Sequence, residues 1–129
     1  MSLKNFISKT TIVFKTFDFN VKLTKNNSEI WNFRTTNPGG DRKYVVYCAP
    51  DLLKSKGVIK IALKKVPSSH RLVVVCSNYD GPDFQDSVDN NYTLVTLDKL
   101  NEYGIEMLEI LERDGGMDPS KTSFTSALG

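Results

Sequence analysis

The stretch that most constrains the fold is "LVVVC", Leu72 to Cys76, where five apolar residues follow one another with no polar residue between them. A strand with one face in water alternates apolar and polar residues, whereas a strand covered on both faces does not. Strands of the second kind lie in the middle of sheets with parallel neighbours, because helices then cover both faces. The run therefore predicts an α/β domain built around a buried parallel strand.

The residues before this run predict an antiparallel meander. Alternating apolar residues, separated by turns rich in Asn, Pro and Gly, predict three strands over residues 10–24, 29–35 and 43–48. The first strand changes parity near Lys15, which predicts a bulge there. One helical turn is expected before it, over residues 3–8.

Between Pro50 and Pro67 the apolar residues recur at helical spacing, which predicts a crossover helix that begins and ends near these prolines. One side of this helix carries five lysines, Lys54, Lys56, Lys60, Lys64 and Lys65. Leu53 and Ile61 fall on the same side, so apolar and charged residues are not fully separated.

The remaining sequence predicts strands over residues 72–76 and 92–97, with a short helix around 84–88 between them. A closing amphipathic helix is expected over residues 99–113, with Asp98 as its N-cap. The outward face of this helix is acidic and consists of Glu102, Glu106, Glu109 and Glu112.

We therefore predict one α/β domain over residues 1–116 and a flexible tail over residues 117–129. Its single mixed sheet contains a three-stranded antiparallel meander and two further buried strands. A crossover helix connects the two parts, and a C-terminal amphipathic helix closes the fold.

Cysteine and histidine content excludes several kinds of active site. Cys48 and Cys76 have no CxxC partner, and His70 is the only histidine, so a zinc site, a catalytic triad and a Cys/His dyad all lack residues. Each cysteine ends an apolar run and is expected to be a buried free thiol. No apolar run is long enough to span a bilayer, and we expect a cytoplasmic protein.

The net charge of +2 conceals a strong asymmetry along the chain. Residues 1–71 contain fourteen Lys or Arg and four Asp or Glu, a balance of +10, whereas residues 72–129 contain three and eleven, a balance of −8. This distribution predicts a molecule with a basic side and an acidic side, unless the fold interleaves and pairs the charges.

The order of elements, together with "HRLVVVCSNYDGPDF" and "NNYTLVTLDKLNEYGIEMLEIL", resembles the restriction-endonuclease-like superfamily of PD-(D/E)XK nucleases and archaeal junction resolvases over residues 10–112. The resemblance implies a divalent metal held by an acid on the second strand and an acid-x-lysine at the end of the third. Here the third strand ends in Tyr47, Cys48 and Ala49 instead. The catalytic signature is therefore degenerate.

Two sets of residues keep metal chemistry open. A nuclease with Mg²⁺ could use Glu29, Asp41 and Lys43, although Asp41 and Lys43 precede their strand. A second metal set, Asp51, Asp80 and Asp98, could meet at the carboxyl edge of the parallel strands, where α/β folds bind ligands. In the preferred interpretation the protein has no catalytic residues and no cofactor.

The residues expected to bind nucleic acid or a partner are Arg42, Lys43, Lys54, Lys56, Lys60, Lys64, Lys65 and Arg71. Thirteen Lys against four Arg favour recognition of shape and charge over base reading. The acidic helix face could dock on a second partner.

We predict a non-enzymatic accessory protein that binds nucleic acid, a protein of nucleic-acid machinery, or both. Abundant Lys and Asn with three Ala are compatible with an A/T-rich genome and a phage-type regulator of host machinery. The alternatives are a metal-dependent nuclease and a regulator that binds protein alone.

Overall fold

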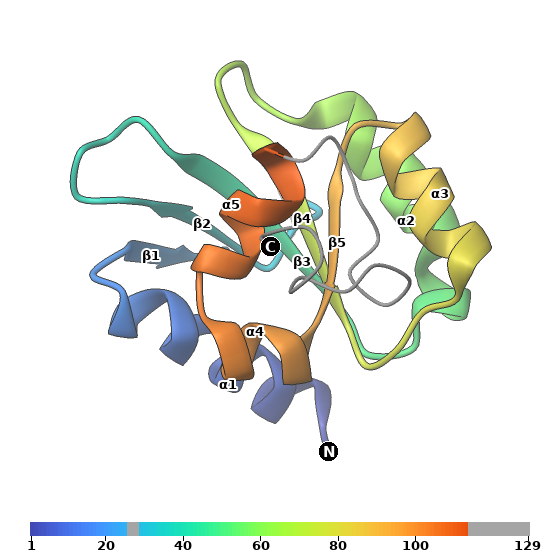
Figure 1. Ribbon diagram of the computed structural model, residues 1–129, viewed down its shortest axis with the longest axis horizontal. Coiled ribbons are helices and arrows are strands. Elements are labelled where there is room, and N and C mark those ends of the chain that lie inside the picture. The colour runs from blue at the N-terminus through green and yellow to red at the C-terminus, as the bar shows by residue number, and fades with distance from the viewer. Residues whose placement is uncertain (26–28, 114–129) are drawn as a thin grey trace, which may run out of the picture.

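The structure, a computed structural model, describes residues 1–25 and 29–113 (Figure 1). The elements are α1 (Leu3–Thr16), β1 (Asn20–Leu23), β2 (Phe33–Thr36), β3 (Lys43–Ala49), α2 (Leu52–Lys65), β4 (Arg71–Cys76), α3 (Gly81–Asp89), β5 (Thr93–Thr96), α4 (Leu97–Tyr103) and α5 (Glu106–Arg113). They form the predicted α/β fold with one mixed sheet. The expected end of the domain at residue 116 and the expected tail lie outside the described residues.

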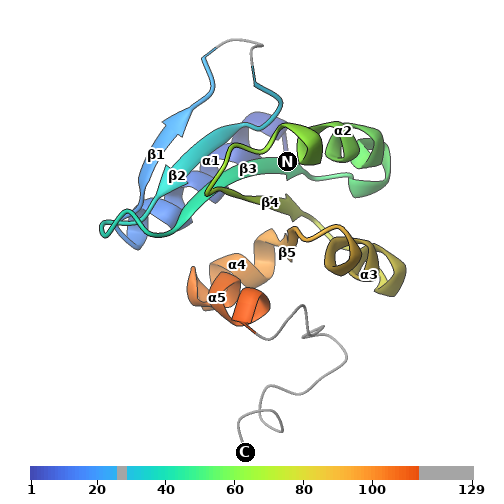
Figure 2. The same ribbon diagram turned by 90° about the horizontal axis from the view of Figure 1, so that it is seen from above.

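The five strands lie in the sheet in the same order as in the chain, from β1 to β5 (Figure 2). β1, β2 and β3 are antiparallel to one another, and β3, β4 and β5 are parallel. β4 has a parallel neighbour on each side, and every residue of it after Arg71 is buried. This confirms that the unbroken apolar run is a central strand covered on both faces.

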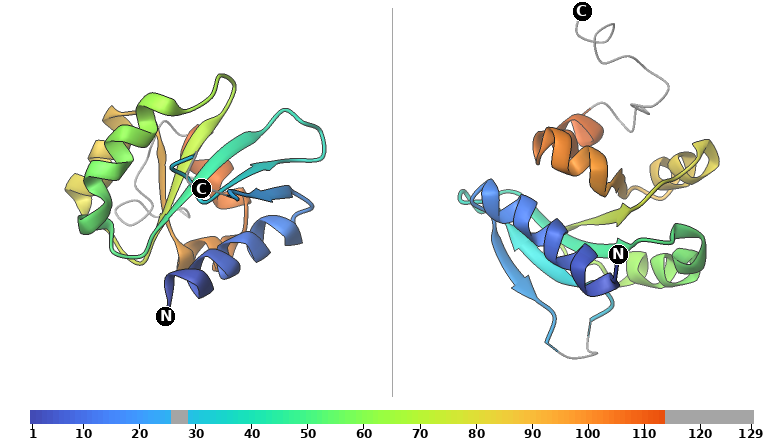
Figure 3. Two further views of the ribbon diagram at one scale, coloured as in Figure 1. Left: turned by 180° about the vertical axis from the view of Figure 1, so that it is seen from behind. Right: turned by 90° about the horizontal axis from the view of Figure 1, so that it is seen from below.

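Helices cover both faces of the sheet (Figures 1 and 3). α2 and α3 lie side by side on one side, and α1, α4 and α5 lie on the other. Val73 and Val75 of β4 face the core under α1, α4 and α5, while Leu72 and Val74 face the core under α2. Phe84 of α3 reaches the first core at the edge of β5.

The first predicted strand is wrong over residues 10–16, because these residues belong to helix α1. Phe6, Thr10, Val13 and Phe14 are buried at helical spacing, whereas Ile12 is 56% exposed. β-branched residues favour strands, but here the buried hydroxyl of Thr10 donates a hydrogen bond to the carbonyl of Phe6 at 2.8 Å, which a helix permits. Near Lys15, where a bulge was expected, α1 ends at Thr16 instead.

The closing helix was also predicted incorrectly, because it is divided into α4 and α5 at Gly104. Gly104 has φ 69° and ψ −161°, a conformation essentially restricted to glycine. A Cβ there would lie 2.2 Å from Cζ of Phe17, so the close approach also requires glycine. The N-cap is Thr96 rather than Asp98, and its hydroxyl accepts from the backbone N–H of Lys99 at 3.2 Å.

Two other predicted elements differ from the observed ones by more than one residue in their bounds. β2 begins at Phe33 rather than at Glu29. The short helix expected around residues 84–88 extends over α3, since Asp80 and Asp83 form a reciprocal capping box at its start.

Candidate functional site

The order of the strands converts the charge asymmetry of the sequence into an asymmetry in space. Since strand order follows chain order, α1 lies with β1 to β3 toward one edge of the sheet, and α3 to α5 lie with β5 toward the other edge (Figure 2). The sequence of α1 contains three lysines and no acidic residue, whereas that of α5 contains three glutamates and one arginine. The cationic and anionic parts of the chain therefore stay largely apart.

One ion pair among the described residues joins the two parts where α2 meets α3. Lys56 Nζ lies 2.7 Å from Asp83 Oδ1. The hydrogen bond to Asp83 raises the pKa of Lys56. Burial opposes ionisation of Asp83, but the hydrogen bond from Lys56 contributes to a net lowering of its pKa. Lys56, predicted to bind a partner, is thus engaged within the protein.

Arg42 is also engaged within the protein. Its Nη1 lies 2.5 Å from Glu109 Oε1 and its Nη2 lies 3.8 Å from Glu112 Oε2, both on α5. The guanidinium also hydrogen-bonds the hydroxyl of Tyr44, whose pKa is raised mainly by burial. Only 19% of the Arg42 side chain is exposed. Lys43 follows it as the half-buried first residue of β3.

The other lysines of α2 point to solvent. Lys54 is 84% exposed and lies 3.8 Å from Asp51. Within residues 1–25 and 29–113, no carboxylate lies within 4.0 Å of Lys60, Lys64 or Lys65. Since Lys64 and Lys65 are in the last turn, they also interact favourably with the helix dipole. Together with Lys56, which is exposed but paired with Asp83, these four lysines are the exposed part of the predicted basic surface.

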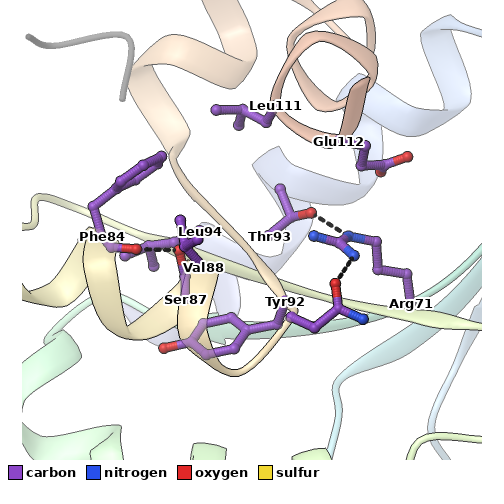
Figure 4. A pocket seen from close by; sticks show the side chains of 10 residues that line it. Arg71, Phe84, Ser87, Val88, Tyr92, Thr93, Leu94, Leu111 and Glu112 are labelled. Carbon is purple, nitrogen blue, oxygen red and sulfur yellow. Dashed lines mark hydrogen bonds between the residues drawn. The ribbon is translucent and has the colours of Figure 1, made fainter. Parts of the chain in front are cut away.

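Arg71 lies at the amino end of β4, on the wall of a cavity of about 110 Å³ (Figure 4). Its Nε donates to Thr93 Oγ1 at 2.7 Å and its Nη1 to Asn91 Oδ1 at 2.9 Å. Ligands of α/β sheets bind at the carboxyl ends of the strands, which is the opposite edge. Through these two hydrogen bonds, Arg71 connects the start of β5 to β4.

The structure does not bring Glu29, Asp41 and Lys43 together. β2 and β3 are antiparallel, with Phe33 opposite Val46 and Thr36 opposite Lys43. Glu29 precedes the start of β2, so it lies toward the end of the sheet distant from Asp41 and Lys43.

The carboxylates of this set are already bonded. Glu29 Oε1 accepts from Arg34 Nη2 at 2.6 Å and its Oε2 from Trp31 Nε1 at 2.7 Å. The hydrogen bond with Arg34 is the main reason for the lowered pKa of Glu29. Asp41 accepts from Asn37 Nδ2 at 2.7 Å, which lowers the pKa of Asp41.

Asp51, Asp80 and Asp98 follow β3, β4 and β5 at the carboxyl edge of the sheet. Asp80 accepts from the backbone N–H of Asp83 at 2.9 Å as a helix cap. Among the side chains that the structure describes, no group of three His, Cys, Asp or Glu is placed to hold a metal ion. A hollow of about 250 Å³ at this edge is lined by Phe6, Leu97 and other residues, of which Asp98 alone is acidic.

At the end of β3, where the resemblance implies acidic residues, the structure has the thiol of Cys48 and the side-chain amide of Asn32. Asn32 Oδ1 accepts from the backbone N–H of Cys48 at 2.7 Å; the sequence had not singled out Asn32. Burial raises the pKa of the thiols of Cys48 and Cys76 to about 12, and both are free cysteines. Protonated and buried thiols are poor nucleophiles and metal ligands.

Comparisons with protein-family models, with curated proteins and with solved structures found no match. In the described ranges, no helix combines the length and apolar character needed to cross a membrane.

Proposed function

We propose that this is a non-enzymatic accessory protein that binds nucleic acid, or a protein of nucleic-acid machinery, through its cationic side. The observation that carries the proposal is the row of exposed α2 lysines, of which Lys60, Lys64 and Lys65 have no carboxylate neighbour among the described residues. Cations left without acidic partners are available to an anionic ligand.

The charge distribution supports the proposal, because the acidic helices α4 and α5 lie on the opposite face of the sheet from α2 (Figure 1). On the face of α2 itself, Asp83 of the neighbouring α3 is paired with Lys56, whereas Lys60, Lys64 and Lys65 have no such partner among the described residues. The order of elements also supports it, since the meander, the crossover helix and the two parallel strands are the elements on which the resemblance to the restriction-endonuclease-like superfamily rests. The proposal extends to a cytoplasmic location and to a phage-type regulator of host machinery.

A salt titration tests the proposal. Binding of labelled duplex and single-stranded DNA is measured by fluorescence anisotropy between about 50 and 200 mM salt, where phosphate contacts weaken strongly. The combined change Lys60→Gln, Lys64→Gln and Lys65→Gln is expected to reduce the slope of log K against log salt by about two to three, since each phosphate contact contributes about 0.9.

The matched control removes three lysines from α1 by Lys4→Gln, Lys9→Gln and Lys15→Gln. It changes the net charge equally and should leave the slope nearly unchanged. Equal effects of the two triple variants would show that net charge, and not the α2 surface, drives binding.

Two results would favour the alternatives. Absence of DNA binding even at about 50 mM salt would favour a regulator that binds protein alone, which a pull-down with and without nuclease treatment would identify. Cutting of plasmid or branched DNA with Mg²⁺ or Mn²⁺, lost in Asp41→Ala or Asp98→Ala, would contradict the non-enzymatic part of the proposal.

A further inference from the structure

Three large apolar residues of α2 are exposed; Val58 is 38% exposed, and the other two, Leu53 and Ile61, are more exposed and lie on its outward side. Leu53 is 76% exposed and Ile61 is 52% exposed. The helix buries Leu52, Ile59 and Ala62 against the sheet, so its apolar requirement for folding is met on the other side. Isolated exposed apolar residues are ordinary, but these two lie on one row of the same helix.

Leu53, Gly57 and Ile61 are spaced four residues apart and form a single ridge, here called the α2 ridge. Leu53 and Ile61 are about 12 Å apart along the axis, at about 1.5 Å per residue. Apart from its chain neighbours and the backbone of its own helix, no described residue has an atom within 4 Å of the position that a Cβ of Gly57 would occupy. The ridge therefore has two apolar knobs with an open notch between them, a shape that accepts side chains of a second helix.

A row of lysines runs beside the α2 ridge. Lys56, Lys60 and Lys64 are also spaced four residues apart and occupy the adjacent row of the helix surface. Lys56 is paired with Asp83, whereas Lys60 and Lys64 have no carboxylate within 4.0 Å in the described part of the chain. A ligand that fits both rows must combine apolar and acidic groups at helical spacing.

We infer that the α2 ridge and its lysine row bind an acidic amphipathic helix of a partner protein. Leucine-like side chains of that helix pack around Gly57 between Leu53 and Ile61. Its Asp or Glu side chains, placed at i and i+4, pair with Lys60 and Lys64. The inference rests on the proposed function and specifies the partner of the same surface.

Other occupants of this surface fit less well. A phosphate backbone gains nothing from Leu53 and Ile61. A second copy packing α2 against α2 would oppose lysine to lysine, and the acidic helix α5 of a second copy buries its own Met107, Leu108 and Leu111. A membrane surface requires a continuous apolar helix face, and that face of α2 is buried against the sheet.

Binding of two designed peptides tests the inference. One helical peptide carries Leu and Glu in adjacent i, i+4 rows, and the other has the same charge with each Leu replaced by Ser. Anisotropy at moderate salt is expected to show at least about tenfold tighter binding of the Leu peptide, because burying one large apolar side chain suffices for this factor.

Matched protein variants locate the contact. Leu53→Ser with Ile61→Ser should weaken binding of the Leu peptide at least about tenfold, to the level of the Ser peptide. Ile12→Ser with Leu23→Ser removes two apolar residues that are 56% and 57% exposed elsewhere, and should leave binding unchanged. Circular dichroism checks that both variants are folded.

Three outcomes would overturn the inference. Equal binding of the two peptides, with DNA binding retained and insensitive to Leu53→Ser and Ile61→Ser, would leave the proposed function intact but make this surface purely electrostatic. Binding to phosphatidylcholine and phosphatidylserine vesicles that depends on Leu53 and Ile61, without peptide binding, would assign the ridge to a membrane. Failure of both peptides and of DNA to bind would overturn the proposed function as well.

Discussion

At the scale of single residues, Glu29 shows how a conspicuous carboxylate can serve the fold. It accepts hydrogen bonds from Arg34 and Trp31, and the guanidinium of Arg34 lies 5.7 Å from the centre of the Trp31 ring. These contacts tie the segment before β2 to the strand itself. Their energy is limited, because 28% of the Glu29 side chain and 38% of the Arg34 side chain are exposed.

The folded protein lowers the pKa of Glu29 from its ordinary value of 4.5, mainly through the Arg34 hydrogen bond. The resulting stabilisation is present above pH 4.5 and is lost as the pH falls through the lowered pKa. We expect Glu29→Gln to reduce the free energy of unfolding by about 1 kcal/mol at neutral pH. Urea unfolding of both proteins is measured near neutral pH and at a pH below the lowered pKa of Glu29, and the difference in their free energies of unfolding should disappear at the acidic pH. If the difference is the same at both pH values, the packing of the Glu29 side chain, and not its charge, stabilises the segment.

At the scale of elements, α1 is where local pattern and tertiary packing disagree. The sequence "TTIVF", Thr10 to Phe14, has the composition of a strand, yet it forms the second half of a helix. Ser2 begins that helix by accepting from the backbone N–H of Asn5 at 3.2 Å. Phe14 is fully buried and contacts Phe19 and Phe33 edge-on at 5.6 and 5.7 Å between ring centroids.

Neighbouring residues of α1 provide the test of this assignment. In the strand first predicted, Ile12 and Phe14 would share the buried face, whereas in the helix Ile12 is 56% exposed and Val13 is 8% exposed. We expect Ile12→Ala to change the free energy of unfolding by less than about 0.5 kcal/mol and Val13→Ala to reduce it by about 1–3 kcal/mol. Chemical denaturation measures both. A larger cost at Ile12 than at Val13 would favour the strand.

At the scale of the whole molecule, Arg42 connects the cationic and anionic parts. It lies before β3, and its guanidinium reaches Glu109 and Glu112 on α5, close to the other end of the chain. Among the described residues, Oε1 of Glu112 is buried without a hydrogen-bond partner, and Arg42 is the cation that lies within 4.0 Å of this carboxylate.

Removal of the guanidinium should therefore be costly. We expect Arg42→Gln to reduce the free energy of unfolding by about 1–3 kcal/mol, because it leaves charged acceptors partly buried and unpaired. The control Glu109→Gln should cost less than about 1 kcal/mol, since the Glu109 side chain is 53% exposed. Thermal or urea unfolding compares the two. Similar small effects of both changes would mean that the connection between the two parts does not depend on this ion pair.

The sequence by itself determined which segments are covered on both faces, the order of the elements from β3 to β5, and the unequal distribution of charge. These properties depend on the type and period of neighbouring residues, which can be read locally. It also identified the lysines of α2 and the two apolar residues, Leu53 and Ile61, that lie on the same side of the helix as these lysines.

Only the tertiary structure decided which side chains meet. Helix α1 forms because Phe14 packs against Phe19 and Phe33, and the closing helix breaks because Phe17 occupies the space beside Gly104. Arg42 and Lys56 are engaged by acids 67 and 27 positions away in the sequence, while none of the acids that the structure describes lies within 4.0 Å of Lys60 or Lys64. Such pairings depend on strand register and on the packing of helices across the sheet, which no local period encodes.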